Sequence, residues 1–295
     1  MDVANERARV LVEALPYIRS FFGKTIVIKY GGSAMVDAGL RTMVAEDLTL
    51  LRYVGMNPVI VHGGGKEITH FMKRLGKEPV FVNGLRVTDA DTIEIAEMVL
   101  TGKINKEIVS LINQNGGKAV GLSGKDACLV TATKVEPGVD YTPEDQCQPV
   151  DLGYVGAVER IDPKVINIMA DAGFIPVISP VASNERGITL NINADHLAGS
   201  LACALKAHKL IMLTDVEGIM GKRGDVLSLI EELTIDETKK MMERRDIAGG
   251  MIPKVEACIT ALQGGVERTH IINGSRPHSL LLEIFTDKGI GTMIL

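Results

Sequence analysis

Tryptophan is absent from the 295-residue sequence, and aromatic residues together make up only 4% of it. No stretch of about 18 apolar residues occurs, so we expect no membrane-spanning helix. The opening residues MDVANERARV carry charges and contain no apolar core, so we expect no signal peptide and a cytoplasmic location. The cysteines are few and far apart and form no C-x-x-C pair, which indicates reduced thiols rather than a disulfide framework or a zinc site; they are Cys128, Cys147, Cys203 and Cys258.

A concentration of positive charge is also missing. The 32 lysines and arginines are outnumbered by 37 aspartates and glutamates, which gives a net charge of −5, and the basic residues form no cluster. This balance excludes a nucleic-acid-binding protein that relies on a basic surface. Apolar residues make up 46% and charged residues 23%, a composition typical of a folded globular protein with a large core.

Hydrophobic periodicity predicts strands that alternate with helices along the chain. A helix is expected over residues 3–22, with a kink at Pro16. The expected strands lie at 24–30, 58–62, 118–123, 127–133, 175–179, 208–214 and 269–272. The further expected helices lie at 38–55, 90–115, 162–172, 194–206, 234–246 and 253–263. This alternation predicts an α/β fold whose mainly parallel sheet is covered by helices on both faces, with a loop or hairpin at 134–153.

Glycine is the residue in excess. The sequence has 31 glycines, about ten more than an average usage near 7% would give. Gly31-Gly32 ends the first predicted strand and Gly63-Gly64-Gly65 ends the second. Ligands of open α/β sheets bind at the carboxyl ends of strands, where glycine lets backbone N–H groups approach an anion. The pattern predicts an anion site, although such glycines also make tight turns without binding anything.

The usual nucleotide-binding motifs are missing. The run from His62 to Lys66 continues with Glu67 instead of serine or threonine, so it is not a P-loop. Gly124-Lys125 is followed by aspartate and fails the same test, and no G-x-G-x-x-G opens a helix. A phosphate site in this chain is therefore expected to be built differently. We interpret His62 as a partner of nearby backbone rather than as a catalytic base.

Two lysines stand where an anion site would need them. Lys29 lies near the end of an apolar strand, two residues before Gly31, and Lys254 lies in the first turn of a predicted helix, where it opposes the helix dipole. Each either faces a bound anion or is a solvated surface charge.

Three more polar residues have one functional and one structural interpretation each. Asn191 and Asp195 precede a predicted helix and would either cap it or recognise a ligand, with Asp195 holding the lysines in place. Arg86 is suited to binding a carboxylate through both guanidinium nitrogens, or else makes a surface salt bridge.

These motifs together resemble the amino-acid kinase family. The resemblance runs in order over about residues 24–295 and rests on six segments: KYGGS (29–33), VHGGGK (61–66), NGLRVT (83–88), NINAD (191–195), LTDVEG (213–218) and GMIPK (250–254). It implies an open αβα sandwich of two lobes. It further implies that residues 1–23 form an oligomerisation helix, that 24–185 bind the acceptor and dimerise, and that 186–295 bind ATP.

Within the family, the closest resemblance is to the branch that phosphorylates the side-chain carboxylate of N-acetyl-L-glutamate with MgATP, in arginine biosynthesis. The resemblance implies catalytic roles for Lys29, Lys254 and Asp195. It implies that the acceptor is held by Gly64, Gly65, Arg86 and Asn191, and the ATP phosphates by Gly31, Gly32, Gly64, Thr214 and Asp215. No tightly bound cofactor and no protein-held metal are expected, because Mg²⁺ would sit on the ATP phosphates.

The same resemblance extends to regulation. One branch of the family forms hexamers as trimers of dimers through a kinked N-terminal helix and is inhibited by arginine. An arginine site is expected at Tyr17, Lys209, His270, Glu283 and Gly289, and a PII signalling protein is a possible partner. Alternatives are a related kinase that uses N-acetylaminoadipate, glutamate or aspartate as acceptor, and a non-catalytic anion sensor with the same fold.

Overall fold

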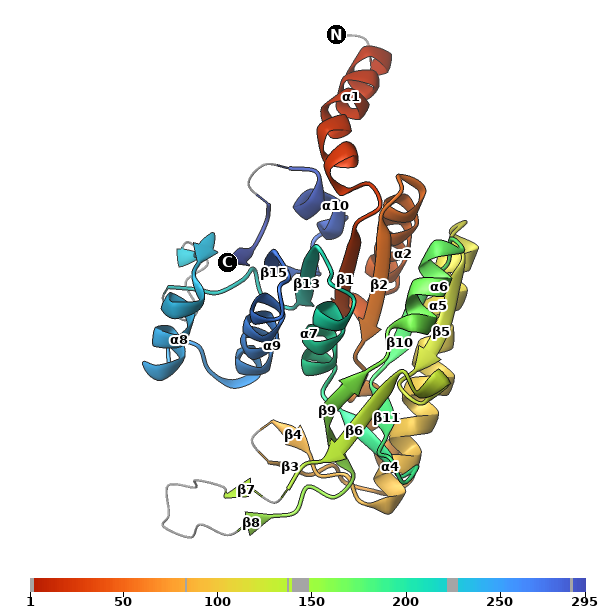
Figure 1. Cartoon of the computed structure of the whole chain (residues 1–295), viewed down its shortest axis with the longest axis vertical. Helices are drawn as coiled ribbons and strands as arrows, with labels where there is room; N and C mark the ends of the chain where they lie inside the picture. The colour runs from red at the N-terminus through yellow and green to blue at the C-terminus, as the bar shows by residue number, and fades with distance from the viewer. Residues whose placement is uncertain (1–2, 83, 137, 140–148, 222–227, 287–288) are drawn as a thin grey trace.

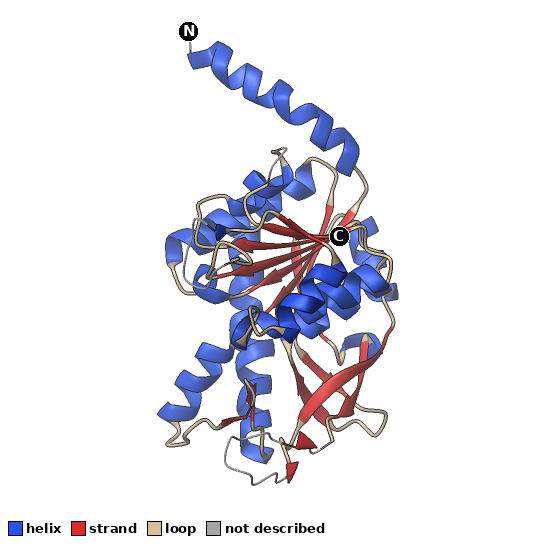
Figure 2. Ribbon diagram, turned by 90° about the vertical axis from the view of Figure 1, so that its left-hand side faces the viewer, coloured by secondary structure: helices blue, strands red, loops and turns tan. Residues whose placement is uncertain are grey.

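The computed structural model describes residues 3–82, 84–136, 138–139, 149–221, 228–286 and 289–295. An eight-stranded sheet forms its centre (Figures 1 and 2). The strands lie in the order β14 (Glu232–Leu233), β16 (Thr292–Ile294), β15 (Arg268–Asn273), β13 (Lys209–Thr214), β1 (Thr25–Tyr30), β2 (Asn57–His62), β10 (Ile175–Ser179) and β5 (Ala119–Ser123). Neighbours are parallel except that β16 runs antiparallel to β15. The predicted mainly parallel sheet is confirmed.

Both faces of the sheet are covered by helices, as Figure 2 shows. Successive side chains of a strand point to opposite faces, so Ile26 and Ile28 of β1 join one core and Val27 joins the other. The first core is completed by α2 (Ala38–Tyr53), α3 (Gly65–Arg74), α4 (Ala90–Glu97), α5 (Asn105–Gln114) and α10 (Ser279–Ile284). The second is completed by α6 (Lys164–Asp171), α7 (Ala194–Ala204), α8 (Ile235–Glu243) and α9 (Ile252–Gln263).

A second, four-stranded sheet lies beyond the carboxyl ends of the central strands and closes on itself (Figure 1). It consists of β6 (Val130–Lys134), β9 (Val155–Ile161), β11 (Val181–Ser183) and β12 (Thr189–Ile192). Of these, only β6 was expected from the sequence. β11 and β12 have only three and four residues, too few for a recognisable alternation of apolar and polar residues.

Two short antiparallel pairs lie near this end of the molecule. One joins β3 (Phe81–Val82) to β4 (Leu85–Arg86). The other joins β7 (Gly138–Val139) to β8 (Pro149–Val150), within the predicted loop or hairpin. The rest of that predicted region, over residues 140–148, lies outside the described residues.

The helix predicted over 90–115 is divided into three parts. A π-helix at Met98–Ile104 separates α4 from α5. The prediction of a helix over this range is confirmed in its extent, but the π-helical part was not expected, because hydrophobic periodicity does not register the extra residue that a π-turn inserts. The π-helix carries Leu100 and Ile104, whose side chains pack where a Cβ on Gly64 would otherwise lie.

The first helix, α1 (Val3–Phe21), projects from the body of the molecule (Figures 1 and 2). Pro16 lies inside the helix and has no N–H, so it cannot donate the usual hydrogen bond to the preceding turn. Phe21 at the base is buried, whereas the outward part exposes large apolar side chains: Val10, Leu11, Val12 and Leu15. Within the described residues, no helix is long and apolar enough to cross a membrane.

His62, the last residue of β2, is fully buried and fixes the start of the glycine loop. Its Nδ1 lies 2.8 Å from the carbonyl oxygen of Gly63, and its Nε2 lies 3.2 Å from the side-chain amide nitrogen (Nδ2) of Asn105. Asn105 in turn donates to the Val177 carbonyl of β10. The structure thus confirms that His62 binds nearby backbone. Burial lowers the pKa of His62 to about 4, so its ring is neutral at physiological pH.

This burial predicts a specific pH dependence of stability. Because the pKa is lower in the folded state, folding is favoured fully above pH 6.5 and loses this contribution as the pH falls toward 4. The shift corresponds to about 3 kcal/mol of unfolding free energy. We expect denaturant unfolding of the His62→Gln variant to lose less stability between pH 7 and pH 4.5 than the parent. The exposed His70→Gln variant is the control, and parallel pH profiles for parent and His62→Gln would contradict the assignment.

Candidate active site

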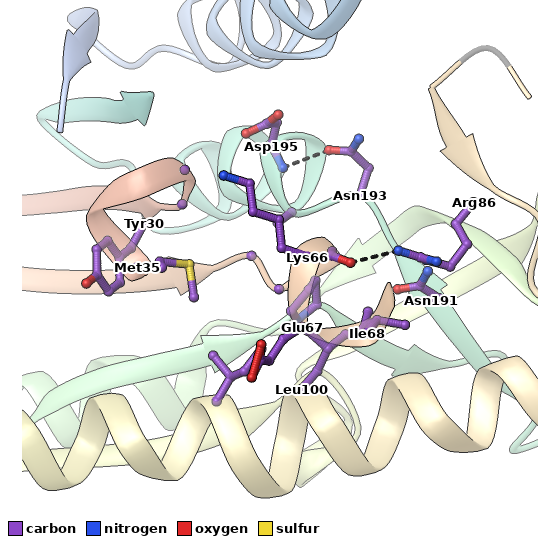
Figure 3. Close-up of a pocket in the computed structure, with 18 of the residues that line it drawn as sticks. Tyr30, Met35, Lys66, Glu67, Ile68, Arg86, Leu100, Asn191, Asn193 and Asp195 are labelled. Carbon is purple, nitrogen blue, oxygen red and sulfur yellow. Dashed lines mark hydrogen bonds between the residues drawn. The ribbon is translucent and has the colours of Figure 1, made fainter. Parts of the chain in front are cut away.

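A cavity of about 560 Å³ opens at the carboxyl ends of β1 and β2. Its walls come from both glycine loops, the π-helix, the start of α7 and the second sheet, and Figure 3 shows how their side chains converge. Gly31, Gly32, Gly63, Gly64 and Gly65 all line it. The two loops predicted to form one anion site therefore do lie together.

At Gly31, Gly32 and Gly64, neighbouring side chains occupy the space that a Cβ would need. A Cβ on Gly31 would overlap the Lys29 side chain, and one on Gly32, where φ is +74°, would overlap the Asp215 carboxylate. A Cβ on Gly64 would overlap the π-helix side chains. Without side chains, the backbone of both glycine loops can be approached directly by charged groups. The Gly32–Met35 3₁₀ helix begins in the first loop and α3 begins in the second.

Two lysines share one buried carboxylate at the edge of this cavity. Lys29 Nζ lies 3.0 Å from Asp195 Oδ1, and Lys254 Nζ lies 2.9 Å from Asp195 Oδ2. All three side chains are at most 15% exposed. Neither lysine is thus a solvated surface charge, and Asp195 lies where it contacts both lysines, as its expected role requires.

The electrostatics of this cluster are set by burial and by charge. Burial lowers the pKa of Lys29, although the Asp195 carboxylate works against that shift. Burial alone would raise the pKa of Asp195, but the two ammonium groups outweigh it and hold that pKa below its ordinary value. The carboxylate is therefore ionised, and it faces the amino groups of both lysines.

The cap of α7 is a different residue. Asn193 Oδ1 accepts a hydrogen bond from the Asp195 N–H at 2.8 Å, and it accepts a second from the His196 N–H. Because Asn193 satisfies the helix end, the Asp195 carboxylate is free to face the lysines. The sequence left open whether this segment caps the helix or recognises a ligand. In the structure, Asn193 caps the helix and Asp195 contacts the two lysines.

Arg86 is buried and is held by neutral groups in the part of the chain that the structure describes. Its guanidinium donates to the Gly65 carbonyl and the Thr69 hydroxyl, both at 2.8 Å, and its NH1 lies 3.2 Å from Met72 Sδ. The group also lies over the Phe81 ring, 4.6 Å from the centroid. Among the described residues no carboxylate pairs with it, so the expected alternative of a surface salt bridge is wrong. Burial lowers its pKa, yet a guanidinium remains charged.

The remaining predicted residues fall into two places. Asn191 of β12 lies on the cavity wall near Arg86, as Figure 3 shows. Thr214 and Asp215 end β13 and lie beside the cavity rather than on its wall. Sequence reasoning missed two residues here. Lys66 lines the cavity, and Ser33 donates its N–H to Asp215. Both stood inside quoted motifs, but nothing in the sequence showed what they face.

The five residues expected to bind arginine lie at the other edge of the sheet, where β13 and β15 begin. His270 Nδ1 lies 2.6 Å from Glu283 Oε1, and Glu283 also accepts the Ile290 N–H next to Gly289. Burial lowers the pKa of His270, whereas the hydrogen bond from His270 keeps the pKa of Glu283 low against the effect of burial.

Of the remaining two residues, Tyr17 belongs to α1, and Lys209 lies against the end of that helix. Lys209 Nζ lies 4.9 Å from the ring centroid of Phe21, and Tyr17 packs edge-on against Phe285. The expected set is thus one cluster, remote from the cavity.

Comparisons with known proteins agree with this geometry. The model of the amino acid kinase family matches residues 24–273. An acetylglutamate kinase of Pelotomaculum thermopropionicum is 60% identical over 294 residues, which cover 100% of this chain and 99% of the relative. An acetylglutamate kinase of Moorella thermoacetica is 54% identical over 98% of this chain and 97% of its own length.

Solved structures show the same architecture. The N-acetylglutamate synthase of Neisseria gonorrhoeae, in complex with coenzyme A and N-acetyl-glutamate, superposes with a TM-score of 0.83 at 28% identity, over 97% of this chain and 63% of that chain. The same synthase with coenzyme A and L-arginine gives a TM-score of 0.80 at 27% identity, over 97% of this chain and 65% of that chain. A carbamate kinase of Giardia lamblia shares the fold, with a TM-score of 0.64 at 18% identity over 92% of this chain and 98% of its own. The chain belongs to the amino acid kinase family, and within it to the acetylglutamate kinases.

Proposed function

We propose that this protein transfers the γ-phosphoryl group of MgATP to the side-chain carboxylate of N-acetyl-L-glutamate and forms N-acetyl-L-glutamyl 5-phosphate, a step of arginine biosynthesis. The observation that carries the proposal is the pair of lysines held on Asp195 at the glycine-lined edge of the cavity. This arrangement concentrates positive charge where two anions must meet. The high identity to acetylglutamate kinases over the full chain supports the choice of acceptor.

The chemistry needs no catalytic base. A glutamate side chain has a pKa of about 4.3 and is already ionised at neutral pH. One of its oxygens attacks the γ-phosphorus, the bond to the β–γ bridging oxygen breaks, and ADP leaves with the electron pair. The obstacle is repulsion between the carboxylate and the polyphosphate, so catalysis depends on positioning and on positive charge. The neutral, buried His62 is consistent with a reaction in which no proton is removed.

Each group of site residues has a role in this reaction. Lys29 and Lys254 stabilise the phosphoryl group in transit, and Asp195 orients both of them. The N–H groups of Gly31, Gly32 and Gly64 bind phosphate oxygens. Thr214 and Asp215 border the nucleotide phosphates, and the nucleotide lies along the C-terminal half near 249–254. Mg²⁺ is assigned to the ATP phosphates, which it accompanies as part of the co-substrate.

Arg86 and Asn191 define the acceptor end of the cavity. Among the described residues no carboxylate pairs with the buried guanidinium, and a bound α-carboxylate would neutralise it through a charge-assisted pair. Gly64 and Gly65 complete this end. We therefore assign residues 24–185 to the acceptor and residues 186–295 to ATP, with β1 and β13 pairing across the boundary within one sheet.

Loss of either lysine is expected to affect turnover more than binding. Lys29→Ala and Lys254→Ala should lower kcat by roughly 10²–10³, because each removes a charge that acts on the transferring phosphoryl group. The KM for N-acetylglutamate should change much less. Steady-state kinetics measure both constants, and Lys24→Ala, an exposed lysine just before the same strand, is the matched control. A near-normal kcat in either variant would remove that lysine from the mechanism.

A panel of acceptors tests the proposed substrate. N-acetylglutamate, N-acetylaminoadipate, glutamate and aspartate are each offered with MgATP, and acyl phosphate is trapped with hydroxylamine. We expect N-acetylglutamate to give the highest kcat/KM. Preference for another acceptor would reassign the protein to a related kinase, and absence of acyl phosphate with all four would favour an anion-binding protein without activity.

We further propose that the protein acts in the cytoplasm as a hexamer built from dimers and is inhibited by arginine. The outward part of α1 exposes Leu11, at 73%, beside further apolar residues, and such a stripe is stabilised when another subunit covers it. The synthase that resembles this chain was crystallised with L-arginine. In the cluster around β13 and β15, Glu283 offers a carboxylate for a guanidinium. A PII-type signalling protein is a further candidate partner.

Removal of the helix tests both parts of this proposal. Deletion of residues 1–20 should reduce the hexamer to dimers and abolish arginine inhibition, as measured by sedimentation velocity and by assays with added arginine. The double variant Leu11→Glu, Leu15→Glu keeps Tyr17 and should disrupt the hexamer alone. An unchanged sedimentation coefficient for the deletion variant would refute the role of α1 in assembly.

A further inference from the structure

Lys66 is a cation on the cavity wall that the reaction as described leaves without a role. It is the second residue of α3, directly after the glycine loop that ends β2, and its side chain is 72% exposed. Figure 3 shows this side chain extended across the cavity toward Asp195. A lysine in the first turn of a helix opposes the helix dipole, so α3 gains no stability from it. An anion bound in front of the first turn of α3 would explain why a lysine stands at position 66.

One carboxylate lies in front of Lys66 in the structure. Asp215 Oδ2 is 3.9 Å from Lys66 Nζ, and Asp215 Oδ1 accepts a hydrogen bond from the Ser33 N–H. The same carboxylate lies so close to Gly32 that any Cβ there would overlap it. Asp215 therefore occupies the glycine loop that is suited to a phosphate, and it does so from the half of the chain assigned to ATP.

These contacts are the ones a phosphate group would make. Carboxylate and phosphate oxygens both accept hydrogen bonds from backbone N–H groups and both pair with an ammonium group. We propose that Lys66 is a third phosphate-binding cation of the site and that Asp215 occupies its place as an internal anion until nucleotide polyphosphate displaces it. The inference rests on the proposed function only in taking MgATP as the ligand.

The exchange has a structural consequence. Lys66 belongs to the acceptor half and Asp215 to the nucleotide half, so their ion pair joins the two across the mouth of the cavity. When polyphosphate replaces Asp215, Lys66 adds its charge to those of Lys29 and Lys254. The carboxylate meanwhile keeps the Ser33 N–H hydrogen-bonded in the absence of nucleotide, which avoids an unpaired donor next to Gly32.

Direct titration of the full-length protein with MgATP and with adenosine, without acceptor, tests this inference. Lys66→Ala should weaken MgATP binding by about tenfold, the usual loss for one hydrogen bond to a charged group, and should leave adenosine binding unchanged. Lys66→Arg should restore most of the affinity. Lys73→Ala, an exposed lysine at the other end of α3, is the matched control and should bind MgATP like the parent.

The Asp215→Asn variant distinguishes two roles for Asp215: an anion that the nucleotide displaces, or a group that helps to bind the nucleotide. If Asp215 only occupies the phosphate position, removal of its charge should tighten MgATP binding severalfold, because the nucleotide no longer competes with it. Weaker binding by Asp215→Asn, or unchanged MgATP binding by Lys66→Ala, would overturn the inference. Because these titrations contain no acceptor, they read nucleotide binding alone. Failure of the parent to bind MgATP would instead refute the proposed kinase function.

Discussion

The site is organised by one buried carboxylate that two lysines share. Lys29 and Lys254 would repel each other at this separation if Asp195 were absent, and burial would favour the neutral form of Lys29. With Asp195 ionised between them, both remain placed in the protein before any substrate arrives. The free energy needed to bring the two lysines together is therefore supplied when the chain folds. The site can then stabilise the charge of a transition state without first rearranging.

This cluster depends on the topology of the sheet. Parallel strands bring all their carboxyl ends to one edge, and the order of strands places β1 between β13 and β2. The glycine loops after β1 and β2 thus become neighbours, while α7 and α9 bring Asp195 and Lys254 to the same edge from the second face. The amino ends of β13 and β15 form the opposite edge, where the His270–Glu283 pair lies. One sheet thereby carries two separate polar clusters.

Several features were accessible from the sequence because they depend on short stretches of chain. Lys29 stands in an apolar strand two residues before a glycine pair, and that local context already singled it out as either a cation that faces an anion or a solvated charge. The alternation of β1 and β2 with helices gave the parallel sheet. Arg86 was predicted either to bind a carboxylate or to make a surface salt bridge, whereas its contacts with Thr69, Met72 and Phe81 were not predicted, because no periodicity connects those residues to it.

Other features required the folded chain. The π-helix at Met98–Ile104 and the short strands β11 and β12 gave no recognisable pattern, since their conformations are imposed by packing against distant segments. The sequence determined which charges and glycines were available and that they would lie at strand ends. Only the tertiary structure decided which charges pair: Lys254 with an aspartate 59 residues away, and Asp215 with a loop 182 residues away. Coulomb forces and hydrogen bonds act through a few ångströms of space, and the distance between two residues along the chain does not specify that separation.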